Sequence, residues 1–302
     1  MGNKPLISVL VANYNNGRYI TQCLDSILAQ TYSNLEIVIV DDMSDDDSID
    51  IINSYQTLHP TADITLYINE SHTCVGYNKN KCIELSLGEY YLFLDPDDTL
   101  SPEAITTLYK GFQEDDSLSI VYATHYLCDE QLNPVRISDW PGCIPSGQSH
   151  ITSREGHISA PALCRRSMYA KTKGVDITLL LAEDQDMYLK LEEIAPVKYV
   201  NKPLYYYRKH ANNISWNEKK ALLNAEYSLK VNISAYKRRK GTMIPNLKWI
   251  DIQRQKLMYH LKCFTVYKTT QEYAAAFKSY MKAMQYFYAD CKFKLLKTLI
   301  KC

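Results

Sequence analysis

Three carboxylates follow one short apolar run in this chain. The run "YYLFL" (90–94) leads directly into "DPDD", which holds Asp95, Asp97 and Asp98. Ionised acids at this spacing repel one another, and a divalent cation offsets the repulsion because it takes oxygen ligands and bridges carboxylates to phosphates. A helix that begins near Ser101 would explain one of these acids but not three. The residues therefore predict metal-assisted chemistry on a phosphate-containing substrate.

Polar residues also follow two other apolar runs. "LISVLVA" (6–12) is followed by a segment with Tyr14, and "LEIVIV" (35–40) by a segment with Asp42. Short runs rich in β-branched residues are typical of strands that are buried on both faces of a parallel sheet. Ligands bind outside the carboxyl ends of such strands. We therefore expect Tyr14, Asp42 and the "DPDD" acids to share one rim of a sheet.

The segments between these runs have helical spacing. "GRYITQCLDSILAQ" (17–30) places Ile20 and Leu24 on one side of a helix, and residues 46–59 repeat the pattern. Alternation of strand and helix over residues 6–95 is typical of an open sheet with helices on both faces. We predict an α/β fold of three layers with a mostly parallel central sheet.

The last third of the chain differs in pattern and in charge. Residues 217–302 have a helical pattern, so we divide the chain into a catalytic domain (1–216) and a basic helical extension (217–302). Residues 236–302 hold 15 basic and 3 acidic side chains, whereas the whole chain holds 34 of each. In 276–302 lysines alternate with large apolar residues, and a basic helix with a broad apolar side can lie in a membrane interface. The alternative is that this side packs on the catalytic domain or on a second copy of the chain.

Composition places the chain among ordinary globular proteins. Hydrophobic residues make up 46% and charged residues 23% of the 302 residues. No stretch approaches the ~18 consecutive apolar residues of a membrane span, and "MGNKPLISVL" lacks the apolar core of a signal peptide. Nine cysteines without a CxxC pair are typical of reduced thiols. We expect a cytoplasmic protein with no nucleic acid partner.

Several motifs, in one order along the chain, resemble those of a known enzyme family. "VANYN" (11–15), "VDDMS" (40–44) and "GEYYLFLDPDD" (88–98) are similar to segments of family 2 glycosyltransferases, which have the GT-A fold. The resemblance covers residues 5–215. It implies transfer of a sugar from a nucleotide-sugar, usually a UDP-sugar, with inversion at the anomeric carbon and with Mn²⁺ or Mg²⁺. Such enzymes act on saccharide or lipid-linked saccharide acceptors, usually in surface polysaccharide synthesis.

The resemblance assigns four residues to the nucleotide-sugar. Ala12 matches the position that holds the uracil by its backbone, and Tyr14 the position that holds it by its ring. Asp42 matches the acid that accepts a hydrogen bond from the base. Arg208, in the later segment "YYYRKH", matches a residue expected to contact phosphate.

A further donor-binding motif is matched by "HTCVGYNKNKC" (72–82). Gly76 and Asn80 keep the family residues, while Lys79 stands where the family has arginine. Lysine keeps the charge but lacks the planar fork of arginine, so its phosphate or ribose contact would be looser. The resemblance nevertheless implies that Gly76, Lys79 and Asn80 bind the nucleotide-sugar.

The resemblance also assigns the metal ligands. Asp95 and Asp97 match the family's DxD motif, in which Asp95 would face the ribose and the metal's waters and Asp97 the metal itself. Asp98 is an extra acid, and the sequence leaves open which of Asp97 and Asp98 lies closer to the ion. His210 matches a histidine ligand that would bind with a neutral imidazole.

The segment "LLLAEDQDMYLKL" (179–191) resembles the motif that carries the general base. An inverting displacement needs a carboxylate on the acceptor side to take the proton of the attacking hydroxyl. Asp184 has that position, with Glu183 beside it. The alternative is that Asp184 only caps the helix that follows.

Two other functions remain open at this stage. "YLFLDPDDTL" resembles the nucleophile motif of haloacid-dehalogenase phosphatases, in which Asp95 would be the nucleophile and Asp97 the acid, although Asp98 replaces a flexible glycine. The chain could also be an inactive relative that binds a nucleotide-sugar without turnover. Cys74 and Cys82, at two glycine positions of the family, support that alternative.

Overall fold

The computed structural model describes residues 4–210, 218–242 and 247–300, with the side chains of 218–219 and 290–300 outside the description. This range includes every site residue that the sequence predicts. The α/β part of the fold lies before residue 211.

The chain divides into two compact units. The first comprises Met1–Pro145 and Ser153–His210, and the second comprises Ser146–Thr152 and Ala211–Cys302. The predicted boundary after residue 216 lies outside the described residues and stays a prediction. The pattern of the sequence does not indicate that the segment 146–152 belongs with the later helices.

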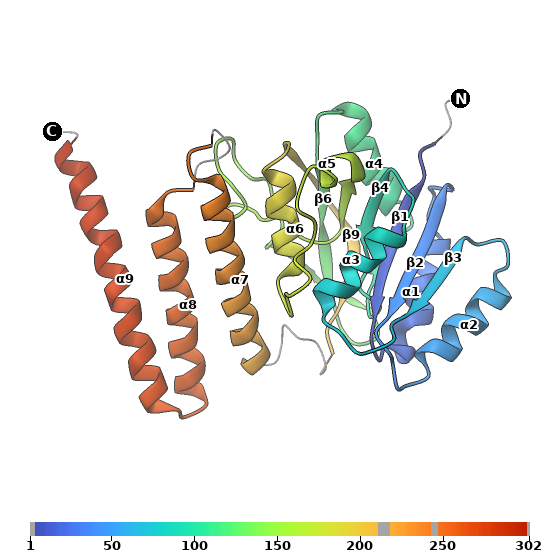
Figure 1. Ribbon diagram of the computed structural model, residues 1–302, viewed down its shortest axis with the longest axis horizontal. Helices are drawn as coiled ribbons and strands as arrows, with labels where there is room; N and C mark the ends of the chain where they lie inside the picture. Colours follow the sequence, from blue (N-terminus) through green and yellow to red (C-terminus); the bar gives the residue numbers. More distant parts are fainter. Residues whose placement is uncertain (1–3, 211–217, 243–246, 301–302) are drawn as a thin grey trace. The chain divides into compact units, whose positions relative to one another are not determined.

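The first unit is built, in its described part, on one sheet of nine strands (Figure 1). In chain order these are β1 (Ile7–Asn13), β2 (Leu35–Asp41), β3 (Ile64–Ile68), β4 (Tyr90–Phe93), β5 (Thr99–Leu100), β6 (Ile120–Cys128), β7 (Pro134–Ile137), β8 (Ala162–Arg165) and β9 (Val197–Arg208). Their order across the sheet is β3-β2-β1-β4-β8-β6-β9-β5, and β7 pairs with β6. β1 to β4 are mutually parallel, as are β6 and β9. β8 runs antiparallel between β4 and β6.

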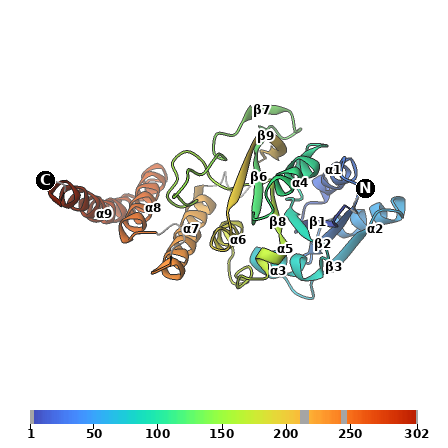
Figure 2. The same ribbon diagram turned by 90° about the horizontal axis from the view of Figure 1, so that it is seen from above.

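Helices cover both faces of this sheet (Figure 2). They are α1 (Gly17–Leu28), α2 (Ser48–Leu58), α3 (Val75–Leu85), α4 (Ala104–Glu114), α5 (Arg166–Tyr169) and α6 (Glu183–Glu192). Successive strand residues point to opposite faces, so Val9 and Val11 pack with α1, α2 and α4. Leu10 packs with α3 and α6 on the other face. Both faces are therefore apolar, which explains the unbroken apolar runs and confirms the predicted three-layer α/β fold.

The parallel strands bring their carboxyl ends to one rim. Asn13, the last residue of β1, lies opposite Asp41, the last residue of β2. Phe93, the last residue of β4, pairs with Leu10 of β1, and Asp95 follows two residues later. In the turns after β1 and β2, Asn15 and Met43 have φ angles of 56° and 60°, a left-handed conformation that is uncommon outside glycine. These residues turn the chain directly from strand toward helix.

The second unit is helical. Its helices are α7 (Glu218–Arg239), α8 (Trp249–Thr269) and α9 (Tyr273–Ile300), and α8 and α9 pack along each other as a hairpin (Figure 1). The predicted helical extension is confirmed. Arg239, which is buried, donates from Nη1 to Ser149 Oγ at 2.8 Å. Gln255 Nε2 donates to the Ile151 carbonyl at 3.1 Å. These two bonds hold the segment 146–152 in this unit.

None of the helices in the described part of the chain combines the length and the apolarity that crossing a bilayer requires.

Candidate functional site

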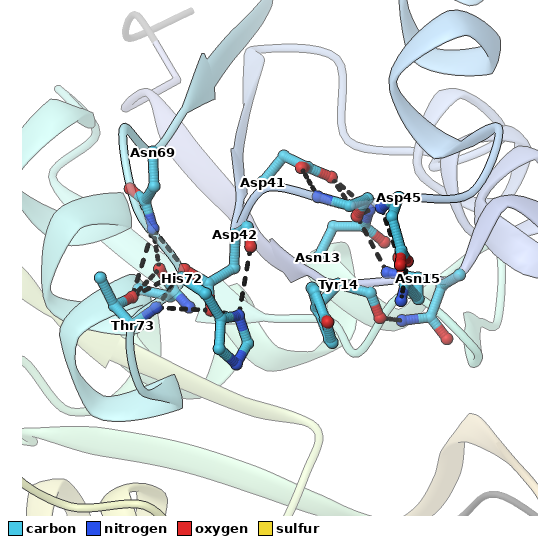
Figure 3. Close-up of polar contacts among 12 residues, drawn as sticks. Asn13, Tyr14, Asn15, Asp41, Asp42, Asp45, Asn69, His72 and Thr73 are labelled. Atoms are coloured by element: carbon cyan, nitrogen blue, oxygen red, sulfur yellow. Dashed lines mark hydrogen bonds and ion pairs between the residues drawn. The ribbon is translucent and has the colours of Figure 1, made fainter.

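The turns after β1 and β2 are joined by a polar network (Figure 3). Asn13 Nδ2 donates to Asp41 Oδ2 at 2.7 Å. The backbone N–H and the hydroxyl of Ser44 donate to the same carboxylate, each at 2.8 Å. Asn15 and Asp45 add two reciprocal bonds, of 2.6 and 2.9 Å. Because Asp41 is buried among these donors, its carboxylate shapes the rim and does not face a ligand.

Asp42, predicted to accept a hydrogen bond from the base, is also enclosed by protein donors (Figure 3). The Thr73 N–H lies 3.0 and 3.1 Å from its two oxygens, and the Thr73 hydroxyl and Asn69 Nδ2 each donate to Oδ1 at 2.7 Å. His72 Nδ1 lies 2.9 Å from Oδ2, and its side chain is 59% exposed. A carboxylate has about four acceptor sites, which these groups fill. His72 is the outermost of them, so a base would reach Asp42 only by taking its place.

Tyr14 and His72 form an exposed aromatic pair at the rim. Their ring centroids are 4.5 Å apart, and Tyr14 is exposed to solvent. Ala12 lies just before this pair on β1, where it is opposite Val40 of β2. Aromatic faces of this kind stack on planar rings. The structure thus places Ala12, Tyr14 and Asp42 at one rim, and their contacts with a nucleotide stay predictions.

Lys79, in α3, gathers three of the predicted site acids around one buried ammonium group. Its Nζ lies 2.6 Å from Asp184 Oδ1, 2.8 Å from Glu183 Oε1 and 4.0 Å from Asp95 Oδ1. It also lies 5.1 Å from the centroid of the Phe93 ring. Burial disfavours the charged amine, but the neighbouring carboxylates outweigh burial and hold the pKa of Lys79 well above its usual value. A contact between Lys79 and phosphate stays a prediction, and it would compete with these ion pairs.

The first turn of α6 separates the roles of the two adjacent acids. Ala182, just before the helix, has a φ of 62°, a strained conformation that a residue with a Cβ adopts only when its surroundings hold it. The Glu183 side chain is 10% exposed, whereas the Asp184 side chain is 38% exposed. Glu183 therefore neutralises Lys79 from inside the protein. Asp184 is the more exposed of the two acids.

Asp95 lies near Lys79 and, along the chain, two residues before Asp97. Desolvation by the surrounding protein raises the pKa of Asp95 to about 7, with Lys79 opposing the shift and Asp184 and Asp97 adding to it. The Asp95 side chain is nevertheless 47% exposed. Water at that exposure stabilises the ionised form, so desolvation acts on this carboxyl less strongly than on a fully covered one.

Asp97 and His210 are brought into direct contact. His210 Nε2 lies 2.8 Å from Asp97 Oδ2, and the His210 ring packs on the ring of Tyr19, with centroids 5.0 Å apart. These two residues are distant in sequence but adjacent in the fold, as the prediction of a shared metal requires. The packing on Tyr19 holds the imidazole in a fixed orientation.

The contacts of Asp98 speak against its predicted role as a metal ligand. Its Oδ2 accepts a hydrogen bond from the Tyr205 hydroxyl at 2.6 Å, and its Oδ1 accepts one from the Arg208 N–H at 2.7 Å. The side chain is buried against β9, and desolvation raises its pKa well above the usual range. Both oxygens are used to fix the loop, so of the two adjacent acids Asp97 is the one at the site.

Arg208 is likewise a structural residue, which speaks against its predicted contact with phosphate. Its guanidinium donates from Nε to the Asp97 carbonyl, from Nη1 to the Glu130 carbonyl and from Nη2 to Gln22 Oε1, each at 2.6 Å. It also lies over the Tyr19 ring, 4.6 Å from the centroid. The side chain is buried, and its donors are used to anchor the "DPDD" loop.

The structure does not place Gly76 and Asn80 with the rim acids. The Gly76 N–H donates to the Leu179 carbonyl at 3.2 Å, and a Cβ at residue 76 would lie 2.6 Å from the Asp176 carbonyl oxygen. Gly76 therefore allows α3 to approach the segment that leads to α6. Asn80 Nδ2 donates to Glu84 Oε1 at 2.7 Å, within the same helix. Nucleotide binding by these two residues stays a prediction.

The donor types at the rim are suitable for a divalent ion. Within the described residues, no group of three or more His, Cys, Asp or Glu side chains is arranged to hold a metal. Asp97 and His210 supply one oxygen and one nitrogen donor side by side, and Asp95 lies on the same loop. Mn²⁺ accepts both donor types, and a bound diphosphate and water commonly complete its coordination. The pair therefore fits such an ion.

Three polar residues of the site have no sequence signal. Tyr205 holds Asp98, while Asn69 and Thr73 hold Asp42. Each is of a common residue type, and each donates a hydrogen bond to an acid that lies far away along the chain. Only the fold identifies them.

Comparison with protein families gives a match over the first part of the chain. The model of "Glycosyl transferase family 2" matches residues 8–170, a span that includes the rim turns, the α3 segment and the "DPDD" loop. The match covers more than half of the chain.

Among curated proteins, the chain is similar to two polysaccharide synthases. It is 34% identical over 217 residues to the chondroitin synthase of Escherichia coli, covering 70% of this chain and 30% of that protein. It is 30% identical over 216 residues to a hyaluronan synthase of Pasteurella multocida, covering 70% of this chain and 21% of that protein. The chain thus spans less than a third of the length of these relatives.

Two solved structures share the fold. Residues 1–349 of S. aureus TarS in complex with UDP-GlcNAc match with a TM-score of 0.58 at 16% identity, over 94% of this chain and 92% of that one. The mannosyltransferase PcManGT from Pyrobaculum calidifontis, in complex with GDP-Man and Mn²⁺, matches with a TM-score of 0.64 at 17% identity, over 99% of this chain and 80% of that one.

Proposed function

The chain belongs to glycosyl transferase family 2, and we propose that it transfers a sugar from a nucleotide-sugar, preferably a UDP-sugar, to a saccharide or lipid-linked saccharide acceptor. The similarity to chondroitin and hyaluronan synthases supports a role in polysaccharide synthesis. The observation that carries the proposal is the Lys79 cluster, which consists of Lys79 with Asp95, Glu183 and Asp184. It holds the partly exposed Asp184 beside Asp95, so a carboxylate base stands next to the predicted donor site.

Asp184 is the general base in this proposal. Its carboxylate takes the proton from the acceptor hydroxyl as the oxygen attacks the anomeric carbon on the face opposite the leaving nucleoside diphosphate. The Lys79 ammonium fixes the carboxylate by the 2.6 Å contact with Oδ1. Glu183 balances the charge of Lys79 from the buried side, so the cluster orients Asp184 before the substrates bind.

The donor binds along the rim in this proposal. The exposed faces of Tyr14 and His72 offer a stacking surface for the base, with Asp42 behind them. The diphosphate then lies toward the "DPDD" loop, because that loop carries the donors suitable for a metal. This order places the sugar near Asp95 and Asp184.

Asp97 and His210 would hold a divalent cation, Mn²⁺ or Mg²⁺. A bound cation supplies a positive charge that stabilises the diphosphate as the glycosidic bond breaks. The protein's own part is to keep the two donors together. Arg208 and Asp98 fix the loop, and Tyr19 fixes the imidazole.

The phosphatase alternative loses its support in this setting. As a phosphatase the chain would need Asp95 as its nucleophile, but Asp95 follows the fourth strand of a sheet whose other rim residues lie in the span that matches family 2. The inactive-relative alternative is separated by experiment, because such a protein would bind a donor but would release no nucleotide in its presence.

The experiment is a panel of UDP-, GDP- and other nucleotide-sugars, assayed for nucleotide release with and without chelator. We expect release from at least one donor, complete loss in excess EDTA, and recovery when Mn²⁺ or Mg²⁺ is added back. Binding of donors with no release from any of them, with saccharide acceptors present, would identify an inactive relative. Turnover that persists unchanged in EDTA would contradict the metal assignment.

A further inference from the structure

The last helix packs against its neighbour through small side chains and through two tyrosines: the Tyr286 ring stacks on the His260 ring of α8, with centroids 5.6 Å apart, and the Tyr280 ring lies 5.7 Å from the Phe264 ring. The residues of α9 that are buried include Ala276, Ser279 and Ala283, which are 4%, 8% and 1% exposed. They recur every three or four positions, so they lie on one side of the helix. That side faces α8, the helix with which α9 forms its hairpin.

Apart from Tyr286, the large apolar side chains of α9 between residues 273 and 288 lie to one side of these small residues and are exposed. We call them the α9 stripe, and their exposed fractions range from 42% to 70%. The α9 stripe consists of Tyr273, Phe277, Tyr280, Met281, Met284, Phe287 and Tyr288. A hairpin that was complete by itself would bury its large apolar residues and expose its small ones, because burial of apolar area stabilises the fold. The exposure of large apolar residues in α9 indicates a surface that another apolar partner, such as a membrane or a protein, covers.

The α9 stripe is wider than a seam for one partner helix. At 100° per residue its members spread over about 120° of the helix circumference. A two-helix coiled coil uses only the narrow seam of positions a and d. Here Met281 and Tyr288 lie beside such a seam and extend it to one side. This width is typical of a helix that lies in a membrane interface.

Charge distinguishes a lipid surface from a second copy of the chain. From residue 249 to residue 289 the acidic side chains are Asp251 and Glu272. Six basic side chains lie in the same span, namely Arg254, Lys256, Lys262, Lys268, Lys278 and Lys282. Lys278 and Lys282 are exposed. At 100° per residue Lys278 lies about 60° beyond the Met281 edge of the stripe and Lys282 about 100° beyond it, so both belong to the polar side of the helix. A second copy would bring the same positive charges to the contact, whereas anionic headgroups neutralise them.

We propose that the α9 stripe lies in the interfacial region of an anionic membrane, with Lys278 and Lys282 at the level of the headgroups. Three tyrosines in the stripe suit this depth, since tyrosine carries a polar hydroxyl on an apolar ring. The helix lies along the surface and does not cross it. The side chains of the lysines between residues 292 and 301 lie outside the part of the chain that the structure describes. The inference rests on α9 itself, and it deepens the proposed function by supplying a surface where a lipid-linked acceptor would be found.

The experiment measures binding of the full chain to vesicles in the absence of substrates, so its result is independent of turnover. The stripe variant carries Phe277→Gln, Met281→Gln and Phe287→Gln together. A matched control carries Leu58→Gln, Leu87→Gln and Val135→Gln, which replace exposed apolar residues of the first unit. Co-sedimentation is compared on phosphatidylcholine vesicles and on vesicles that also contain phosphatidylglycerol.

We expect the wild-type chain and the control to bind the anionic vesicles and the stripe variant to bind roughly a hundredfold more weakly. Lys278→Gln with Lys282→Gln should weaken binding about 30-fold, because each basic residue near an anionic surface contributes ~1 kcal/mol. Equal binding by the wild type and the stripe variant, or no binding by either, overturns the proposal. So does a wild-type dimer that the stripe variant converts to a monomer in sedimentation velocity, since the stripe would then bind a second copy.

Discussion

The strands that carry the site bury their large apolar side chains, whereas the last helix exposes most of its own. In β1 and β4 the large apolar residues are covered on both faces of the sheet. In α9 most of the large apolar residues are exposed, while Ala276 and Ala283 are buried. Even the charged side chain of Lys79, which α3 places at the rim of the sheet, is buried among opposite charges. The apolar side chains of the sheet are covered by other parts of the same chain, whereas α9 leaves part of its apolar surface for a partner.

This difference predicts that substitutions in the two regions act on different properties. Changes at the rim or in the sheet should alter the free energy of unfolding or the turnover. Changes in the α9 stripe should alter neither, and should appear only in binding to a membrane. The following variants test that separation, from the largest expected effect to the smallest.

Lys79→Met should lower the free energy of unfolding most, by about 3–5 kcal/mol, because it leaves the buried Glu183 carboxylate without its counter-charge. Lys81→Met is the matched control on the same helix, and its side chain is 25% exposed. We expect the control to cost at most about 1 kcal/mol. Urea denaturation of the three proteins measures the difference. Equal midpoints for Lys79→Met and wild type would show that the cluster does not stabilise the fold.

Leu92→Ala compares a sheet residue with the α9 stripe directly. Leu92 is fully buried in the core of β4, so its truncation should lower the free energy of unfolding by about 2–5 kcal/mol. Phe277→Ala removes a larger side chain from an exposed position and should change it by no more than about 0.5 kcal/mol. If both variants lose stability equally, the stripe is covered within the chain, and the contrast between the regions disappears.

Asp184→Asn should lower turnover by about 10²-fold or more, since it removes the general base. Lys79 keeps Glu183 as its counter-charge in this variant, so the loss of stability should be smaller than for Lys79→Met. Donor affinity, measured by calorimetry, should also survive. An unchanged turnover with lost donor binding would place Asp184 on the donor side and contradict its role as the base.

Asp97→Asn and Asp98→Asn separate the two adjacent acids. Asp98→Asn should destabilise the fold by about 1–3 kcal/mol, because an amide cannot accept both hydrogen bonds that Tyr205 and Arg208 donate. Asp97→Asn should leave stability within about 0.5 kcal/mol and should raise the Mn²⁺ concentration needed for half-maximal turnover. The reverse pattern would restore Asp98 as the ligand.

Much of the fold follows from local patterns in the sequence. The runs at 6–12 and 35–40 become β1 and β2, because their apolar residues are continuous and their ends are polar. The shared rim follows in turn, since parallel strands end at one edge. The "ED" and "DPDD" motifs each have a recognisable spacing, so the acids could be assigned before their contacts were known.

What the sequence could not provide is the direction in which a side chain points when its partner is distant. Asp97 and Asp98 are neighbours of the same type, and only the contacts of Asp98 with β9 turn it inward. Arg208 has the charge of a phosphate ligand, but Glu130 and Gln22 occupy its donors. On α9, helical spacing identifies an apolar side but does not reveal that the alanines face α8.

The segment Ser146–Thr152 has a consequence for how this chain could be divided or recombined. Because it lies in the helical unit while the residues before and after it lie in the α/β unit, the polypeptide passes between the two units three times. The α7–α9 helices are therefore not a removable module. A fragment that ends at residue 216 would keep Ser149 and Ile151 but would lose Arg239 and Gln255, to which they are bonded. Exchange of the helical unit between related enzymes, whether by gene fusion in the laboratory or by recombination in evolution, would have to carry this internal loop along with the carboxy-terminal third.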